Sequence, residues 1–134
     1  KAIADYNRAL KIDPKYALAY NNRGYTYFEK GELNKAIADY NRALKIDPKY
    51  ALAYNNRGYT YFEKGELDQA IADINKAIKI DTELAYAYHS RGEVYAKLGD
   101  KKRAIQDFKK AAKLYGEQGE TAKRQEVLEL LKQL

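Results

Sequence analysis

The sequence contains no cysteine and only one histidine among its 134 residues. The lack of cysteine excludes a disulfide framework and a thiolate metal site. Catalysis generally needs several convergent groups, such as a nucleophile with a base, and His89 alone does not supply them. A glycine-rich phosphate loop is also missing. We therefore expect a protein that is not an enzyme, with no catalytic or metal-binding residues and no cofactor.

The sequence also lacks long apolar runs. No stretch approaches the roughly 20 apolar residues of a membrane span, and no charged segment followed by an apolar one suggests a signal peptide. By default we expect a cytoplasmic protein with no membrane contact.

The composition, by contrast, is that of a chain that folds. Hydrophobic residues make up 46% and charged residues 33%, as in soluble, helix-rich proteins rather than disordered ones. The chain is long enough for one ordinary domain with a buried core. The net charge is +6, and the basic excess is largest toward the C-terminus.

One unit of 34 residues is repeated along the chain. Residues 1–34 recur as 35–68 with a single change at the last position. Residues 69–102 keep the same skeleton with different surface residues, and a further copy begins at Arg103 and then diverges. Repeats of about 20 to 50 residues are typical of solenoids, in which each unit buries its apolar face against its neighbours.

Each unit contains two helical patterns. The first, over residues 1–12, places Ala2, Tyr6 and Ala9 on one face of a helix, and Pro14 prevents its continuation. Because the same spacing recurs in every copy, we expect one such helix per unit.

The second pattern runs over about residues 16–30. It places Tyr20, Gly24 and Tyr27 on one face, and Gly31 ends it because glycine enters the left-handed region without strain. We expect the next helix to be capped at its N-terminus by the polar residues that follow each such glycine, namely Asn34, Asp68 and Asp100.

The spacing of small and aromatic residues resembles that of the tetratricopeptide repeat family. The matching positions in one unit are Tyr20, Gly24, Tyr27, Ala36, Tyr40, Ala43 and Pro48. The resemblance implies an all-α fold, a right-handed α-solenoid of antiparallel helical hairpins over residues 1–134. In the family's framing the parts are a lone second helix at 1–16, repeats at 17–50, 51–84 and 85–118, and a capping helix at 119–134.

The two ends of the chain differ from the repeats. A terminal amphipathic helix is expected near residues 120–133, with Val127, Leu131 and Leu134 along its apolar side. The N-terminal helix lacks its usual partner, so we expect a partly exposed apolar set there: Ala2, Ile3, Tyr6, Ala9 and Leu10.

A second stripe of residues on each first helix is left over from packing. In the tetratricopeptide family this stripe lines the concave inner surface, where a partner's peptide binds. The resemblance therefore implies a groove formed by Leu18, Asn21, Asn22, Tyr25, Phe28, Leu52, Asn55, Asn56, Tyr59, Phe62, Tyr86, His89 and Ser90. On this basis we predict a non-enzymatic scaffold that holds a segment of a partner protein.

The identity of the groove residues discriminates between ligands. Chaperone-binding members of the family hold a C-terminal carboxylate, but of the matching positions here only Asn56 agrees and the cationic residues are missing. Asn22 and Asn56 instead resemble the asparagine ladder of O-linked N-acetylglucosamine transferase, in which each amide binds the backbone of an extended peptide. The asparagine amide both donates and accepts hydrogen bonds, and Ser90 interrupts the ladder.

Three other interpretations stay open at the sequence level. The asparagines and the adjacent aromatic residues could form an idle surface, because duplication copies used and unused positions alike. The unpaired N-terminal helix could dock on another copy of the chain and build a self-assembling array. More weakly, nucleic acid could contact the basic set Lys101, Lys102, Arg103, Lys109, Lys110 and Lys113.

Charged residues also recur at fixed positions. Arginine recurs at 23, 57 and 91, and aspartate at 5, 39, 73 and 107. Their retention in the divergent copy predicts an Arg–Asp pair between the two helices of each unit, close to the surface and of small energy.

Overall fold

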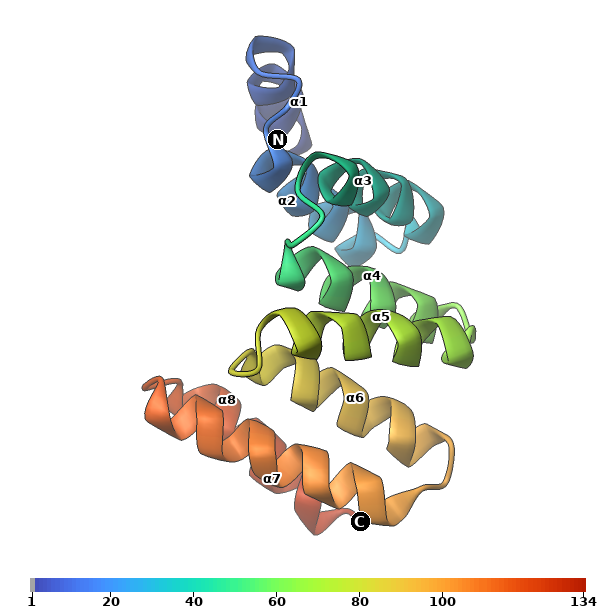
Figure 1. The fold of residues 1–134 in the computed structure, drawn as a ribbon, viewed down its shortest axis with the longest axis vertical. Helices are drawn as coiled ribbons and strands as arrows, with labels where there is room; N and C mark the ends of the chain where they lie inside the picture. The colour runs from blue at the N-terminus through green and yellow to red at the C-terminus, as the bar shows by residue number, and fades with distance from the viewer. Residues whose placement is uncertain (1) are drawn as a thin grey trace.

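The computed structural model describes residues 2–134, and all regular secondary structure in this range is α-helix. Its helices are α1 (Ala2–Ile12), α2 (Ala17–Glu29), α3 (Leu33–Ile46), α4 (Ala51–Glu63), α5 (Leu67–Ile80), α6 (Ala85–Lys97), α7 (Lys101–Glu117) and α8 (Thr121–Lys132). They follow one another along an elongated stack, with the two termini at opposite ends (Figure 1). Within residues 2–134 no helix is both long and apolar enough to cross a bilayer.

The helices pack as antiparallel hairpins, which confirms the predicted solenoid. The most extensive contacts join α2 to α3, α4 to α5, and α6 to α7, while α8 packs against α7. Helices α2 and α4 also touch, as do α4 and α6, although each pair is separated in sequence by a whole helix. The first helices of successive hairpins therefore form one continuous surface.

A glycine in each first helix lets the second helix approach closely. A Cβ atom on Gly24 would lie 2.8 Å from the Tyr40 ring, and one on Gly92 would lie 2.7 Å from the Phe108 ring. Such distances are too short for carbon atoms in contact, so the aromatic ring of the second helix occupies the place of a side chain. Gly24, one of the positions that match the family, therefore serves the close packing of α2 and α3.

The turns between helices use glycine as predicted. Gly31 has φ +80°, and the equivalent residues of the other hairpins, Gly65 and Gly99, also have positive φ values. The left-handed conformation satisfies the ends of the preceding helix without the strain that a side chain would add.

The predicted N-caps were wrong in two of three cases. Helix α3 begins at Leu33 and α5 at Leu67, so Asn34 and Asp68 lie inside the first turn, and neither helix has a side-chain cap. Asp100 does cap α7, since its carboxylate accepts a hydrogen bond of 3.1 Å from the Arg103 amide. The error arose because Asp100 was aligned with Asn34 and Asp68. Its true equivalents are Glu32 and Glu66, which occupy the N-cap positions of α3 and α5.

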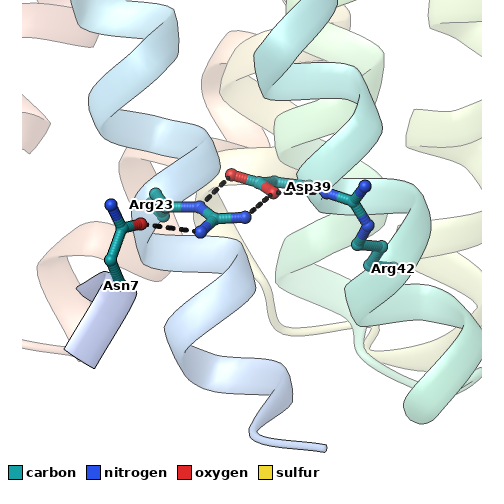
Figure 2. A network of polar contacts seen from close by, with 4 residues as sticks. All are labelled: Asn7, Arg23, Asp39 and Arg42. Carbon is teal, nitrogen blue, oxygen red and sulfur yellow. Dashed lines mark hydrogen bonds and ion pairs between the residues drawn. The ribbon is translucent and has the colours of Figure 1, made fainter. Parts of the chain in front are cut away.

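The predicted Arg–Asp pair is present in every hairpin. Arg23 donates two hydrogen bonds to Asp39, of 2.8 and 2.7 Å, and a third to Asn7 of α1, while Arg42 approaches the same carboxylate (Figure 2). The pairs Arg57–Asp73 and Arg91–Asp107 have the same two-bond geometry.

The prediction placed these pairs too near the surface. Asp39 is only 1% exposed, and the other two aspartates are also buried. Because two of its hydrogen bonds go to the carboxylate and one to an asparagine of the preceding hairpin, each arginine joins three consecutive helices. Within residues 2–134, Asp5 of α1 has no such partner from another helix and instead contacts Arg8 of its own helix at the surface.

The ends of the stack agree with expectation except at Leu10, which was expected to be partly exposed. On α1, Ala2 is exposed and Ile3, Tyr6 and Ala9 are half-buried, whereas Leu10 is buried. On α8, Val127 is fully buried in the cluster that contains Phe108 and Tyr115, and Leu131 and Leu134 pack against it.

Candidate functional site

The surface formed by the first helices is hollowed into a groove of about 580 Å³. Its walls come from α2, α4 and α6, with contributions from α1, α3 and α8. The lining residues are Tyr6, Asn21, Asn22, Tyr25, Thr26, Phe28, Glu29, Tyr40, Leu52, Asn55, Asn56, Tyr59, Tyr86, His89, Ser90, Glu93, Lys123 and Glu126.

Most residues assigned to the groove from the sequence line it. The two that do not are Leu18 and Phe62. Leu18 is 46% exposed outside the hollow. Phe62 packs against the core between the second and third hairpins and borders a smaller hollow at the end of α4, together with Lys97.

Asn21 and Asn56 form a hydrogen bond across two helices. The Nδ2 atom of Asn56 donates to Oδ1 of Asn21 over 3.0 Å, and Asn21 is only 2% exposed. Asn21 is therefore not part of an idle surface, which was one of the alternatives left open by the sequence. Asn22 is different, because its half-buried side chain has no hydrogen bond within residues 2–134.

The equivalent hydrogen bond is missing between the next two first helices, α4 and α6. Asn55 corresponds to Asn21, and the residue that corresponds to Asn56 is Ser90, whose side chain is shorter. Asn55 is 4% exposed, and its Oδ1 atom is buried without a hydrogen bond to any described residue. The substitution of serine for asparagine thus leaves a buried acceptor unpaired at the groove wall.

The Tyr40 hydroxyl is a second unpaired polar group at the groove. The Tyr40 ring fills the space above Gly24, its side chain is fully buried, and the hydroxyl has no hydrogen bond to the described residues. Burial raises the pKa of Tyr40, because the phenolate would lose its hydration, and the neighbouring Thr60 hydroxyl opposes part of this rise.

A chain of polar contacts crosses the C-terminal half of the groove. The Tyr59 hydroxyl donates to Glu93 over 2.7 Å. The His89 ring lies between Glu93, at 3.4 Å from Nε2, and the Tyr115 hydroxyl, at 3.0 Å from Nδ1. Burial, together with the bond to Glu93, raises the pKa of Tyr59, and burial raises that of Tyr115. The His89 side chain is largely enclosed by this network.

Aromatic rings form a row along the other half of the groove. The Tyr25 and Phe28 rings stack with centroids 6.0 Å apart, and Phe28 meets Tyr59 edge-on at 5.7 Å. The row continues to Phe62 at 5.5 Å. Tyr25 remains 47% exposed, so the row presents apolar surface to the groove.

Sequence reasoning missed several lining residues, namely Tyr6, Thr26, Glu29, Tyr40, Glu93, Lys123 and Glu126. Glu29 and Glu93 belong to the same helix stripe but were left out of the site. Tyr40 was assigned to helix packing, and in the structure it both packs against Gly24 and lines the groove. Lys123 and Glu126 are three residues apart on α8, a spacing that places them on one face, and this signal in the capping helix was available.

Helix α8 closes one end of the groove. The Lys123 ammonium lies 5.0 Å from the centre of the Tyr86 ring. Its contact with Tyr86, reinforced by the charge of Glu126, raises the pKa of Lys123. The capping helix is therefore also part of the groove wall.

The basic residues of α7 lie elsewhere. The six lysines and arginines named above are all exposed, and none lines the groove. Asp107 of the same helix is buried against Arg91 and does not share the exposed basic surface.

Together the fold and the groove define a helical-repeat solenoid with one continuous inner surface. The family model for the TPR repeat matches the chain three times, and the model for the tetratricopeptide repeat matches it once; the matched residues are 1–31, 24–65, 58–99 and 85–117. The chain belongs to the tetratricopeptide repeat family, whose domains mediate protein interactions.

Solved structures of the family are similar to this one. The crystal structure of MamA has a TM-score of 0.71 and 28% identity, over 97% of this chain and 82% of that one. YrrB, described as a TPR protein with an unusual peptide-binding site, has a TM-score of 0.73 and 28% identity, over 81% and 56%. The first TPR of Spaghetti (RPAP3), bound to the HSP90 peptide SRMEEVD, has a TM-score of 0.72 and 26% identity, over 90% and 96%. No curated protein sequence gives a significant match.

Proposed function

We propose that the chain is a non-enzymatic scaffold that holds an extended segment of a partner protein in its groove. The observation that carries the proposal is the exposed aromatic row beside an amide without an internal partner. Tyr25 offers apolar surface that folding leaves uncovered, and Asn22 offers a donor and an acceptor on the adjacent turn.

The asparagine ladder enters this proposal in modified form. Within residues 2–134 the side chain of Asn22 has no hydrogen bond, so all of its donors and its acceptor can bind a peptide backbone. Asn56 uses one N–H of Nδ2 to bind Asn21, so its second N–H and its Oδ1 remain for a ligand. Asn56 therefore supports the groove wall and can also contact the ligand.

The size of the groove and two similar structures support a peptide ligand. A volume of about 580 Å³ lies in the range of about 300–1,000 Å³ that is usual for ligand sites. Both YrrB and the first TPR of Spaghetti are described with a peptide or a peptide-binding site.

The proposal can be tested by selection from a displayed library of random peptides. We expect the native protein to enrich peptides that compete with one another for one site. The double variant Tyr25→Ala/Leu52→Ala should lose most of the capture, because both side chains line the groove. Asn22→Ala should weaken capture while leaving the fold intact.

A matched control removes the same two residue types elsewhere. Tyr16 and Leu98 are both exposed and lie outside the groove, so Tyr16→Ala/Leu98→Ala should capture peptides as the native protein does. Equal capture by the groove variant and the control would exclude the groove as the binding site.

A further inference from the structure

The groove is acidic although the chain as a whole is basic. The net charge of the chain is +6, yet three carboxylates line the groove, from Glu29, Glu93 and Glu126, against a single lysine, Lys123. A groove of one sign concentrates the field and favours ligands of the opposite charge.

The three carboxylates differ in whether they already have a partner within the protein. Glu29 and Glu126 are exposed and form no ion pair within residues 2–134. Glu93 accepts from Tyr59 and lies near His89, but neither contact supplies a permanent positive charge. The ammonium of Lys123 is occupied against the Tyr86 ring.

The side chain of Asn55 independently indicates that the ligand brings a hydrogen-bond donor into the groove. Its buried Oδ1 atom is an acceptor without a partner, and such an atom costs about 1–3 kcal/mol when it stays unpaired. Asn55 lies one helical turn before Tyr59, whose hydroxyl contacts Glu93. The unpaired acceptor and the carboxylate therefore belong to the same part of the groove wall.

We propose that the bound segment carries a lysine or arginine whose cationic end enters the groove between Asn55 and Glu93. This inference rests on the proposed peptide-binding function and names the chemistry of its ligand. The unpaired Oδ1 of Asn55 and the carboxylate of Glu93 are both acceptors, and lysine and arginine side chains are donors only. Their apolar stems can pack against the neighbouring aromatic rings while the charged end reaches the carboxylate.

The same arrangement disfavours an acidic ligand. The peptide seen with the first TPR of Spaghetti, SRMEEVD, carries three acidic side chains. In the groove described here such side chains would meet Glu29 and Glu93, and like charges placed together oppose binding.

Synthetic peptide pools test the proposal directly. In each pool the central residue of a short fluorescent peptide is fixed as lysine, arginine, leucine or glutamate, and the other positions are randomised over uncharged residues. Fluorescence anisotropy then gives the mean affinity. We expect the lysine and arginine pools to bind at least about tenfold more tightly than the glutamate pool, with a difference that shrinks as salt is added.

A variant and its control locate the charge that matters. Glu93→Gln keeps the acceptor for Tyr59 and removes the charge, so the preference for lysine over leucine should fall about fivefold. Glu117→Gln removes an equal charge outside the groove and should leave that preference unchanged. An equal effect of both substitutions would show a general charge effect and overturn the proposal.

The remaining outcomes separate this inference from the proposed function. If all four pools bind the native protein equally and Tyr25→Ala/Leu52→Ala binds none of them, the groove binds peptides but the cationic site is wrong. If no pool binds the native protein, the proposed function fails and the inference fails with it.

Asn55→Leu supplies a test that does not depend on charge. Leucine has the branched shape of asparagine without its polar atoms, so the variant should fold at least as stably as the native protein. It should nevertheless bind the lysine pool more weakly. Unchanged binding of that pool by the folded variant would remove Asn55 from the site.

Discussion

Asn56 of α4 donates a 3.0 Å hydrogen bond to the buried Oδ1 of Asn21 on α2, and so joins the first helices of two consecutive hairpins. These helices form the groove, and this bond is a direct polar contact between them. Asn56 is adjacent in sequence to Arg57, which also joins the two hairpins, through its hydrogen bond to Asn41 of α3.

Asn56→Ala should therefore destabilise the fold, whereas Asn22→Ala should not. The first substitution leaves the buried oxygen of Asn21 without a donor, which costs about 1–3 kcal/mol. Asn22 forms no side-chain hydrogen bond within the described residues, so its removal should change the free energy of unfolding by less than about 0.5 kcal/mol. Urea denaturation of both variants measures the difference, and equal stabilities would contradict the structural role of Asn56.

The sequence predicts the architecture well because its signals are local and repeated. The positions of Gly24, Tyr40 and Gly31 follow from helical period and backbone freedom, and each occupies the place expected. The Arg23–Asp39 pair was also predictable, since both residues recur at a fixed separation of 16 residues.

The polar contacts of the groove are harder to read from the sequence. The bond between Asn56 and Asn21 depends on how far one hairpin rotates against the next, and no single repeat contains that information. The position of Lys123 depends on how α8 folds back on α7. For the same reason the unpaired oxygen of Asn55 becomes visible only when Ser90 is seen to be its neighbour.

Arg57→Ala should be among the more destabilising single substitutions in the chain. It leaves the carboxylate of Asp73 unpaired, and that side chain is only 11% exposed. Removal of one partner from a buried ion pair costs about 3–5 kcal/mol, and we expect about 3 kcal/mol because Arg57 keeps some contact with water.

The matched control is Arg8→Ala, which breaks the surface pair with Asp5. Both of these side chains are more than half exposed, so the loss should stay below about 1 kcal/mol. Thermal unfolding of the two variants provides the comparison, and similar melting temperatures would show that burial does not strengthen the Arg57 pair.

Stability should fall at high pH, partly through Tyr40. Burial raises the pKa of Tyr40 above the value of about 10 in an unfolded chain. Between these two values the unfolded chain loses the hydroxyl proton while the folded protein keeps it. The contribution is therefore complete below about pH 10 and is lost as the pH rises through the pKa of the folded state.

Tyr40→Phe should consequently flatten the decline of unfolding free energy above about pH 10. At neutral pH the same variant should be as stable as the native protein or slightly more so, because it removes a buried hydroxyl without a partner. Tyr59→Phe should instead lose stability at neutral pH, since that hydroxyl binds Glu93. If Tyr40→Phe also lost stability there, an additional partner for its hydroxyl would be required.

Two glycines inside helices should respond in opposite ways to replacement by alanine. Alanine favours a helix over glycine by about 1 kcal/mol, so both substitutions gain from propensity. On Gly92 the new methyl group would lie 2.7 Å from the buried ring of Phe108, and overpacking of this kind costs about 1–3 kcal/mol. On Gly116 the nearest atom is 3.2 Å away in Arg124, whose exposed, flexible side chain can move.

Gly92→Ala should thus lower the melting temperature and Gly116→Ala should raise it slightly. A rise for Gly92→Ala would mean that the third hairpin has room to open, and that its glycine is retained for some reason other than close packing.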